Sequence, residues 1–304
     1  MEPERDVELS ELLQEVRRIE VQSRRLVTGV MAGGYHSVFR GSGIEFEEVR
    51  EYAEGDDSRS VDWNVTARVG RPYIKKYVDE RELTVLFLLD LSASMTGGFS
   101  AWSVRQMATR ICACLALSAV GNHDKVGLLA FSREVDKYVP PAKGQAHALR
   151  IVRDCLALPC RPGAGSMVPA LEMATQVVRR KSIVFLISDF LSEGWRQAMQ
   201  SCALRHDLIA VRLLPPELHH PPRALLRLRD PESGEQRVVD FRNRKVRQAY
   251  AERTQAWRKR NEELLRRVGV DRMDVPIPAE RSPEAVAKPI LEFFRMRELR
   301  GAKR

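Results

Sequence analysis

Three oxygen-bearing side chains follow an apolar segment in residues 84–95. The run Thr-Val-Leu-Phe-Leu-Leu ends at Asp90, and Ser92 and Ser94 follow at alternate positions. A continuous apolar run that ends abruptly in polar residues is typical of a strand buried on both faces. In an open α/β sheet, ligands bind beyond the carboxyl ends of the strands, where these side chains would lie. Their oxygens suit a hard cation such as Mg²⁺, although Asp and Ser are also common in plain turns.

Two further segments carry residues that could belong to the same site as Asp90, Ser92 and Ser94. The apolar run of residues 182–188 ends at Asp189, again at the exit of a predicted strand. Between the two strands, Gly163-Ala164-Gly165-Ser166 is a glycine-rich loop that leads into a helical pattern. In this order, the three segments resemble the metal-ion-dependent adhesion site (MIDAS) of von Willebrand factor type A domains.

The resemblance implies a ligand set for one divalent cation, Mg²⁺ or else Mn²⁺ or Ca²⁺. By the family's pattern, the oxygens around the cation would come from Asp90, Ser92, Ser94, Ser166 and Asp189. The family usually has Thr where this chain has Ser166, so the hydroxyl is retained on a side chain whose rotamer is less restrained.

A second resemblance covers the residues upstream of the first strand. Three segments are similar to the signature of the bacterial domain-of-unknown-function family 58: Phe46–Tyr52, Gly55–Arg68 with its Asp62-Trp63 pair, and Glu80–Glu82. In that family the signature leads directly into a type A domain. Its members are commonly encoded beside MoxR-type AAA+ ATPases. The resemblance therefore implies that such an ATPase is the partner and that the chain is its adaptor or co-chaperone.

From Leu83 onward, predicted strands alternate with predicted helices. Strand patterns occupy residues 84–90, 125–131, 134–139, 183–187, 207–213 and 268–275, and helical patterns occupy 103–120, 145–158, 168–178, 242–268 and 283–299. This alternation predicts an α/β fold with a doubly wound, mostly parallel sheet flanked by helices. We expect a type A-like domain over residues 83–280, followed by a C-terminal helix and basic tail over 281–304.

Residues 1–82 are expected to form a helix at about 8–28 and then the short strands and turns of the acidic signature segment. This part carries 13 basic and 18 acidic side chains, a net charge of −5, and the remaining 222 residues carry 37 and 23, a net charge of +14. Because opposite charges attract, we expect the segment to pack on the main domain, with Trp63 buried as its anchor.

Composition excludes several classes of protein. No uninterrupted apolar stretch reaches about 18 residues, and the acidic N-terminus lacks the apolar core of a secretory signal, so we expect a cytoplasmic protein without a membrane span. The five cysteines lack zinc-site spacing and are expected to be reduced thiols. No phosphate-binding loop, nucleophile elbow or zinc-protease motif occurs.

These observations favour a non-enzymatic module that captures an acidic residue of a partner through the cation. Two alternatives stay open. A metal-assisted hydrolase would use the same oxygen ligands but would need a general base near Asp90. A nucleic-acid-binding protein would use the basic surface of the helix predicted at residues 242–268, and its affinity would fall steeply with salt.

Overall fold

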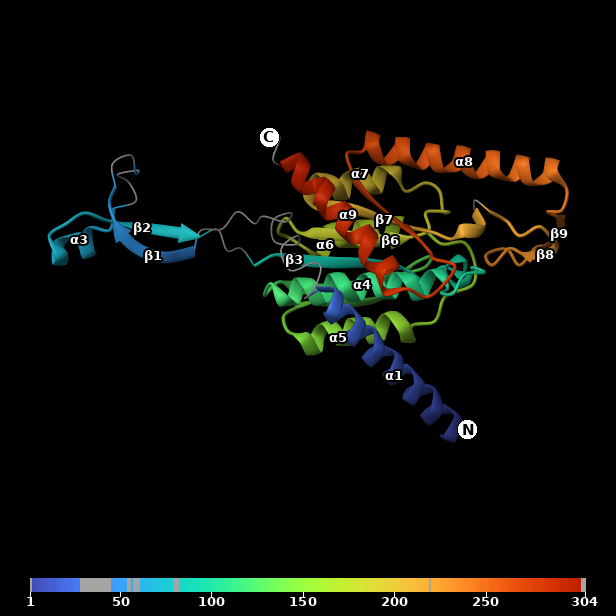
Figure 1. Cartoon of the computed structure of the whole chain (residues 1–304), viewed down its shortest axis with the longest axis horizontal. Coiled ribbons are helices and arrows are strands. Elements are labelled where there is room, and N and C mark those ends of the chain that lie inside the picture. The colour runs from blue at the N-terminus through green and yellow to red at the C-terminus, as the bar shows by residue number, and fades with distance from the viewer. Residues whose placement is uncertain are drawn as a thin grey trace.

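The centre of the protein is a six-stranded sheet (Figure 1). The computed structural model describes residues 2–27, 45–53, 56, 61–78, 82–218 and 220–301. The strands are β3 (Thr84–Asp90), β4 (Lys125–Phe131), β5 (Val135–Ala142), β6 (Ile183–Ser188), β7 (Asp207–Leu214) and β10 (Asp271–Pro276). Their spatial order is β10-β7-β6-β3-β4-β5, and every neighbouring pair is parallel except β4 with β5. The predicted doubly wound, mostly parallel sheet is confirmed.

Helices bury both faces of this sheet. One face packs against α4 (Val104–Gly121), α5 (Gln145–Ala157) and α9 (Pro283–Gly301). The other packs against α6 (Val168–Val177), α7 (Arg196–Arg205) and α8 (Arg244–Arg267). Successive side chains of β3 alternate between the two layers, Phe87 in the first and Leu88 in the second, and both are fully buried. Burial on both faces explains why β3 is a continuous apolar run.

The position of β3 creates the crevice that the sequence predicts. After β3 the chain forms α4 and β4 on one side of it, whereas β6 lies on the other side. The strand order therefore reverses between β3 and β6, which is a switch point of the sheet. Because the two strands are parallel and Leu89 is paired with Ile187, both chains leave the sheet at the same edge.

The N-terminal helix α1 (Glu2–Leu26) packs on α4 and α5. Val16, Ile19 and Ser23 are buried on its inner side, and the Ser23 hydroxyl lies 3.3 Å from the Cys114 sulfur. Glu15 forms an ion pair with Arg110 of α4. Four basic residues of the helix are exposed: Arg17, Arg18, Arg24 and Arg25. The helix is confirmed and begins before residue 8.

The signature segment forms a small unit of its own. Strand β1 (Glu45–Glu51) pairs antiparallel with β2 (Tyr73–Val78), and the short helix α3 (Trp63–Val69) lies between them in the chain. In Figure 1 these three elements lie apart from the central sheet. Of the signature residues, Gly55, Asp57–Ser60 and Glu80–Arg81 lie outside the described residues.

The prediction that Trp63 is buried is wrong, because 73% of its surface is exposed. Two of the acidic residues on which that prediction depended, Asp56 and Asp62, bind partners inside the segment itself. Arg50 binds Asp56 at 2.7 Å, and Asp62 caps the N-terminus of α3 by accepting hydrogen bonds from two backbone N–H groups. These two carboxylates are therefore engaged within the segment, and no residue of α3 is buried.

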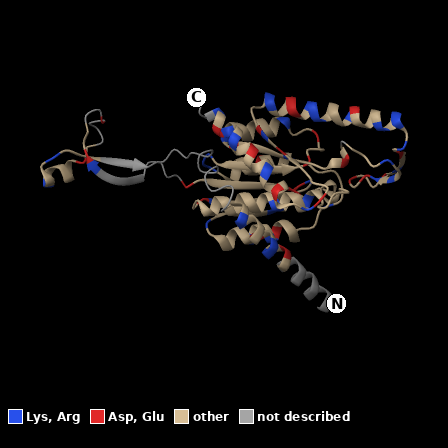
Figure 2. Ribbon diagram, in the orientation of Figure 1, with Lys and Arg blue, Asp and Glu red and all other residues tan. Residues whose placement is uncertain are grey.

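The remaining elements lie outside the sheet. Strands β8 (Leu225–Arg229) and β9 (Gln236–Asp240) form an antiparallel hairpin, and Ala93–Thr96 (η3) and Pro216–Leu218 (η4) are short 3₁₀ turns. Figure 2 shows basic and acidic residues interspersed along α8, whose apolar residues pack into the core on its face of the sheet. No described helix is both long and apolar enough to cross a membrane. All five cysteines are free thiols.

Candidate functional site

The loop after β3 is fixed by its backbone. Leu91 N–H donates to the Phe131 carbonyl of β4 at 2.6 Å, and the Leu91 carbonyl accepts from Arg161 N–H at 2.9 Å. Ser92 is the residue before the turn η3, and its N–H donates to Asp90 Oδ1 at 2.8 Å. The chain therefore folds back at the strand end and holds the Asp90 carboxylate against the first residues of the loop.

A continuous set of hydrogen bonds joins the two strand ends. The hydroxyl oxygens of Ser92 and Ser94 are 3.0 Å apart, and Ser94 lies near enough to the Asp189 carboxylate to favour its charged form. On the other side, Ser188 Oγ donates to Asp90 Oδ2 at 2.6 Å. The structure thus brings together four of the five predicted site side chains, from β3, its loop and the end of β6.

The two carboxylates are buried without a cationic partner. Asp90 is 3% exposed and Asp189 is 5% exposed. Burial, followed by the negative charge of Asp189, raises the pKa of Asp90 to about 6. Burial also raises the pKa of Asp189, against the hydrogen bonds from Ser94 and Leu191 N–H. None of the ion pairs found among the described residues includes either group, so a bound cation would remove an electrostatic penalty.

The glycine-rich loop approaches Ser92 and Asp90 at Gly165. A Cβ atom on Gly165 would lie 2.7 Å from the Ser92 Cβ and 3.8 Å from Asp90 Oδ1, so only glycine permits this approach. Ser166 follows directly, and its N–H is held by the Ser132 carbonyl at 2.8 Å. Its Oγ accepts from Val168 N–H at 3.4 Å and is half-buried. Ser166 therefore lies at the margin of the site, and a hydroxyl oxygen can accept a second bond.

Ser188 is a member of the site that the sequence analysis missed. Its hydroxyl is fully buried, donates to Asp90 and accepts from Phe190 N–H at 3.0 Å. A signal was present, since parallel pairing of the two apolar runs places the residue before Asp189 beside Asp90. Phe190 then adopts a left-handed conformation, φ 60°, that turns the chain away from the sheet.

Glu232 is a second residue that the sequence did not reveal. It lies in the turn between β8 and β9, near enough to the Gly165 N–H and to Asp189 for both to affect the pKa of its carboxyl. Partial burial raises its pKa, and the negative charge of Asp189 contributes. Glu232 is 43 or more residues away from every other site residue in the chain. Only the folded structure brings it to this edge of the sheet.

The donor set fits a hard divalent cation. It consists of two carboxylates and short-chain hydroxyls, which are oxygen ligands of the kind that Mg²⁺ binds alongside several waters. Within the part of the chain that the structure describes, no group of three or more His, Cys, Asp or Glu side chains could hold a metal ion. A zinc-type or strongly anionic centre is therefore absent from those residues, and the hydroxyl-rich site is the candidate.

Ser188→Ala is expected to lower the free energy of unfolding by about 1 to 3 kcal/mol. The substitution removes the donor to a buried carboxylate and leaves Asp90 Oδ2 unsatisfied. Urea denaturation would measure the change. Ser192→Ala is the matched control. Among the described residues the buried Ser192 Oγ has no hydrogen-bond partner, so its loss should change the free energy of unfolding little. Equal stability of the two variants would contradict this role for Ser188.

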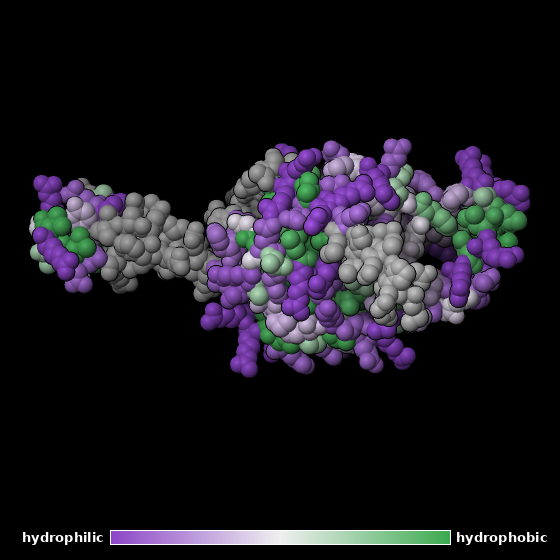
Figure 3. All heavy atoms as spheres, turned by 90° about the horizontal axis from the view of Figure 1, so that it is seen from below, coloured by the Kyte–Doolittle hydropathy of each residue, from purple (hydrophilic) through white to green (hydrophobic). Residues whose placement is uncertain are grey.

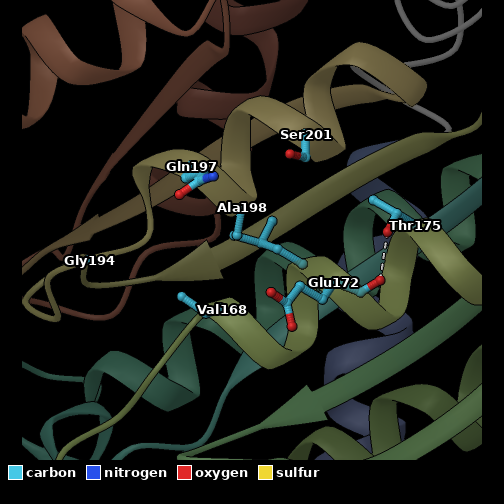
Figure 4. A pocket seen from close by; sticks show the side chains of 8 residues that line it. Val168, Glu172, Thr175, Gly194, Gln197, Ala198 and Ser201 are labelled. Carbon is cyan, nitrogen blue, oxygen red and sulfur yellow. Dashed lines mark hydrogen bonds between the residues drawn. The ribbon is translucent and has the colours of Figure 1, made fainter.

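A separate hollow lies between α6 and α7 (Figure 4). It has a volume of about 290 Å³ and is lined by Val168, Leu171, Glu172, Thr175, Gly194, Gln197, Ala198 and Ser201. None of the site residues lines it. Its polar groups, chiefly Glu172 and Gln197, come from facing helices and form no cluster resembling the one at the strand ends (Figure 4).

The chain is similar to several known proteins. Rv1480, an uncharacterized protein of Mycobacterium tuberculosis, is 29% identical over 233 residues, which cover 75% of this chain and 74% of the relative. Among solved structures, BatB from Bacteroides thetaiotaomicron has 17% identity, covers 70% of this chain and 99% of its own, and has a TM-score of 0.43. An aerotolerance-related membrane protein from Bacteroides fragilis has 18% identity, covers 70% and 100%, and has a TM-score of 0.45.

The family model for "Protein of unknown function DUF58" matches residues 48–260. The match includes all but the first two residues of the signature segment, the predicted site residues at the strand ends and most of α8. The sheet order and its helical layers are those of a von Willebrand factor type A-like domain. The chain therefore belongs to the DUF58 family and carries a type A-like domain.

Proposed function

We propose that this protein is a non-enzymatic interaction module that binds an acidic residue of a partner protein through a divalent cation. The type A-like fold is that of a protein-interaction module. The observation that supports the finer proposal is the pair of buried carboxylates, Asp90 and Asp189, joined by serine hydroxyls and lacking a cationic partner.

The chain's own groups suit such capture. Ser92, Ser94 and Ser166 would offer hydroxyl oxygens, and Asp90 and Asp189 would bind directly or through water. Two carboxylates only just balance a divalent charge, and Ser188 and backbone N–H groups already share their electron density. A cation held in this way stays electrophilic, which favours an additional carboxylate supplied from outside.

As the partner we propose a MoxR-type AAA+ ATPase, for which the protein would act as an adaptor in the cytoplasm. Membership of DUF58 supports the choice of partner, through the usual gene neighbourhood of that family. Four buried free thiols and a fifth that is partly buried support a reducing compartment.

The test is binding of the purified MoxR-type ATPase of the same organism, measured by calorimetry in Mg²⁺ and in EDTA. We expect binding in Mg²⁺, loss in EDTA and loss in Asp189→Asn. Glu263→Gln is the matched control, since Glu263 is an exposed carboxylate on α8 and should bind normally. Binding that persists in EDTA would contradict the metal bridge. Affinity for DNA or RNA that falls steeply with salt, or hydrolysis of phosphoesters or peptides, would favour the rival functions.

A further inference from the structure

The long helix α8 has a strongly basic outer face. Seven cations and two acids are exposed along its 24 residues. In Figure 1 the helix runs along the upper margin of the molecule, and Figure 2 shows basic residues from one end of it to the other. The outer face is therefore open to a partner over the full length of the helix.

The acids of α8 leave most of this charge uncompensated. Glu262 lies half-buried on the inner side, where three arginines engage it, two of them from the sheet. Among the described residues, Arg267 alone of the seven exposed cations is found in an ion pair, with Glu263 at 3.7 Å. The other six add to the net charge of the chain, which is +9, and are available to an acidic partner.

The exposed cations form two rows, because seven residues are nearly two turns of an α-helix. One row is Arg253, Arg260 and Arg267, and the other is Lys245, Lys259 and Arg266. Neighbours seven residues apart are separated by about 10.5 Å along the helix axis. Helical periodicity places the exposed Ala249 and Ala256 between the rows. The face is thus a stripe of small side chains with positive charge on both flanks.

The inner side of the helix holds this face rigidly. Asn261 is buried, and its Nδ2 donates to the Phe190 carbonyl at 3.3 Å. Thr254 and Leu265 are buried on the same side. At the N-terminus, the Asn243 side chain accepts a hydrogen bond from Lys245 N–H at 2.9 Å. A partner therefore meets rows of cations whose backbone is already ordered, which lowers the entropic cost of docking.

We propose that the outer face of α8 docks an acidic helix of a partner protein. In this complex Ala249 and Ala256 lie at the centre of the contact, and rows of Asp or Glu face the two rows of cations. Acids seven residues apart on a helix have the same spacing of about 10.5 Å, so several ion pairs form in one register. Each exposed pair contributes little, but several together select an acidic helix over a neutral or basic one. The proposal needs no cation at the strand ends and stands apart from the proposed function.

Nucleic acid matches this face less well. Each strand of DNA presents a phosphate about every 3.4 Å, whereas the cations of one row are about 10.5 Å apart. The exposed acids Glu252 and Glu263 would face phosphates. Single strands stack on exposed aromatic rings, but Tyr250 and Trp257 of α8 pack inward.

A membrane surface also fits less well. A helix that lies in the membrane interface needs large apolar side chains on its outer face. Of the large hydrophobic side chains that are exposed among the described residues, none belongs to α8. Two of them, Leu225 and Val238, belong to the β8–β9 hairpin, and Figure 3 shows hydrophobic residues at that end of the molecule.

The probe for the test is a fluorescent 28-residue peptide of four seven-residue repeats, each with Glu at its first two positions and Ala elsewhere. Fluorescence anisotropy in EDTA should show binding to the whole protein, weakened when KCl rises from 50 to 300 mM. The same peptide with Gln in place of Glu should not bind. The double variant Arg253→Glu/Arg260→Glu should bind the Glu peptide about tenfold more weakly, because two attractions become repulsions.

The matched control is Arg227→Glu/Arg229→Glu, which makes the same change in net charge at two exposed positions of β8 and should bind as the wild type. No binding of the Glu peptide, or an equal loss of affinity in the two double variants, would overturn the proposal. So would tighter binding of a 24-base-pair DNA duplex, or of vesicles with one third phosphatidylserine, that depends on Arg253 and Arg260. Because EDTA is present throughout, these outcomes leave the proposed cation bridge to its own test.

Discussion

Replacing Asp90 by Asn is expected to abolish Mg²⁺ binding and Mg²⁺-dependent partner binding, and to leave the protein at least as stable in EDTA. The reason is that Asp90 is buried beside Asp189 with no cationic side chain in an ion pair with either. Without a cation, its negative charge opposes folding. The amide keeps an acceptor for Ser92 N–H, and the Ser188 hydroxyl can turn to accept from the amide.

The pH dependence of the free energy of unfolding tests the effect of the negative charge on Asp90. Asp90 has a native-state pKa of about 6, above its ordinary value of 3.8. Between these values the native protein keeps a proton that the unfolded chain has released, so the free energy of unfolding falls as pH rises. In EDTA this part of the wild-type dependence should extend from about pH 4 to about pH 6. This fall in the free energy of unfolding with rising pH should be much smaller in Asp90→Asn. In the wild type, saturating Mg²⁺ should act against it.

A carboxylate in an ion pair provides the contrasting control. Asp274 of β10 binds the fully buried guanidinium of Arg212 at 2.7 Å. Removing its charge leaves a buried cation short of a partner, so Asp274→Asn should be clearly destabilising. Chemical denaturation in EDTA at pH 8 would compare the two variants. A loss of stability in Asp90→Asn as large as that in Asp274→Asn would mean that Asp90 has a purely structural role.

The sequence predicted this site because its main residues are local to strand ends. Asp90 and Asp189 each terminate an apolar run, and parallel strands in one sheet leave at the same edge. The spacing of Ser92 and Ser94 needed only the short turn after β3. For these residues, periodicity and topology together place the side chains without any knowledge of packing.

The rest depended on contacts that no local pattern encodes. Glu232 reaches the site across a hairpin inserted far along the chain, and nothing in its turn distinguishes it from an exposed acidic residue. The prediction that Trp63 is buried was wrong for the opposite reason, since it left local contacts out of account. The prediction summed charge over whole segments, whereas Asp56 and Asp62 bind partners within the segment itself. Exposed charges are screened beyond about 8 Å in physiological salt, so contacts with near partners count for more than the net charge of a distant segment.

Gly165→Ala should damage both the stability of the protein and its cation site. The new Cβ atom would lie 2.7 Å from the Ser92 Cβ, which is closer than two carbon atoms can approach. Ser92 has little room to yield, because its hydroxyl is bonded to Ser94 and its backbone forms a bridge with Arg161. Pushing the loops apart should cost about 1 to 3 kcal/mol in the free energy of unfolding.

The same shift should weaken Mn²⁺ binding, because the substitution moves Ser166 and the Gly165 N–H away from the two carboxylates. Urea denaturation and Mn²⁺ calorimetry would measure the two effects. Gly121→Ala is the matched control: it lies at the end of α4, and a Cβ there meets no atom within 4 Å. Alanine at that position should be neutral or stabilising by up to about 1 kcal/mol. Wild-type Mn²⁺ affinity in Gly165→Ala would show that the glycine-rich loop takes no part in the site, because the clash must displace one loop or the other.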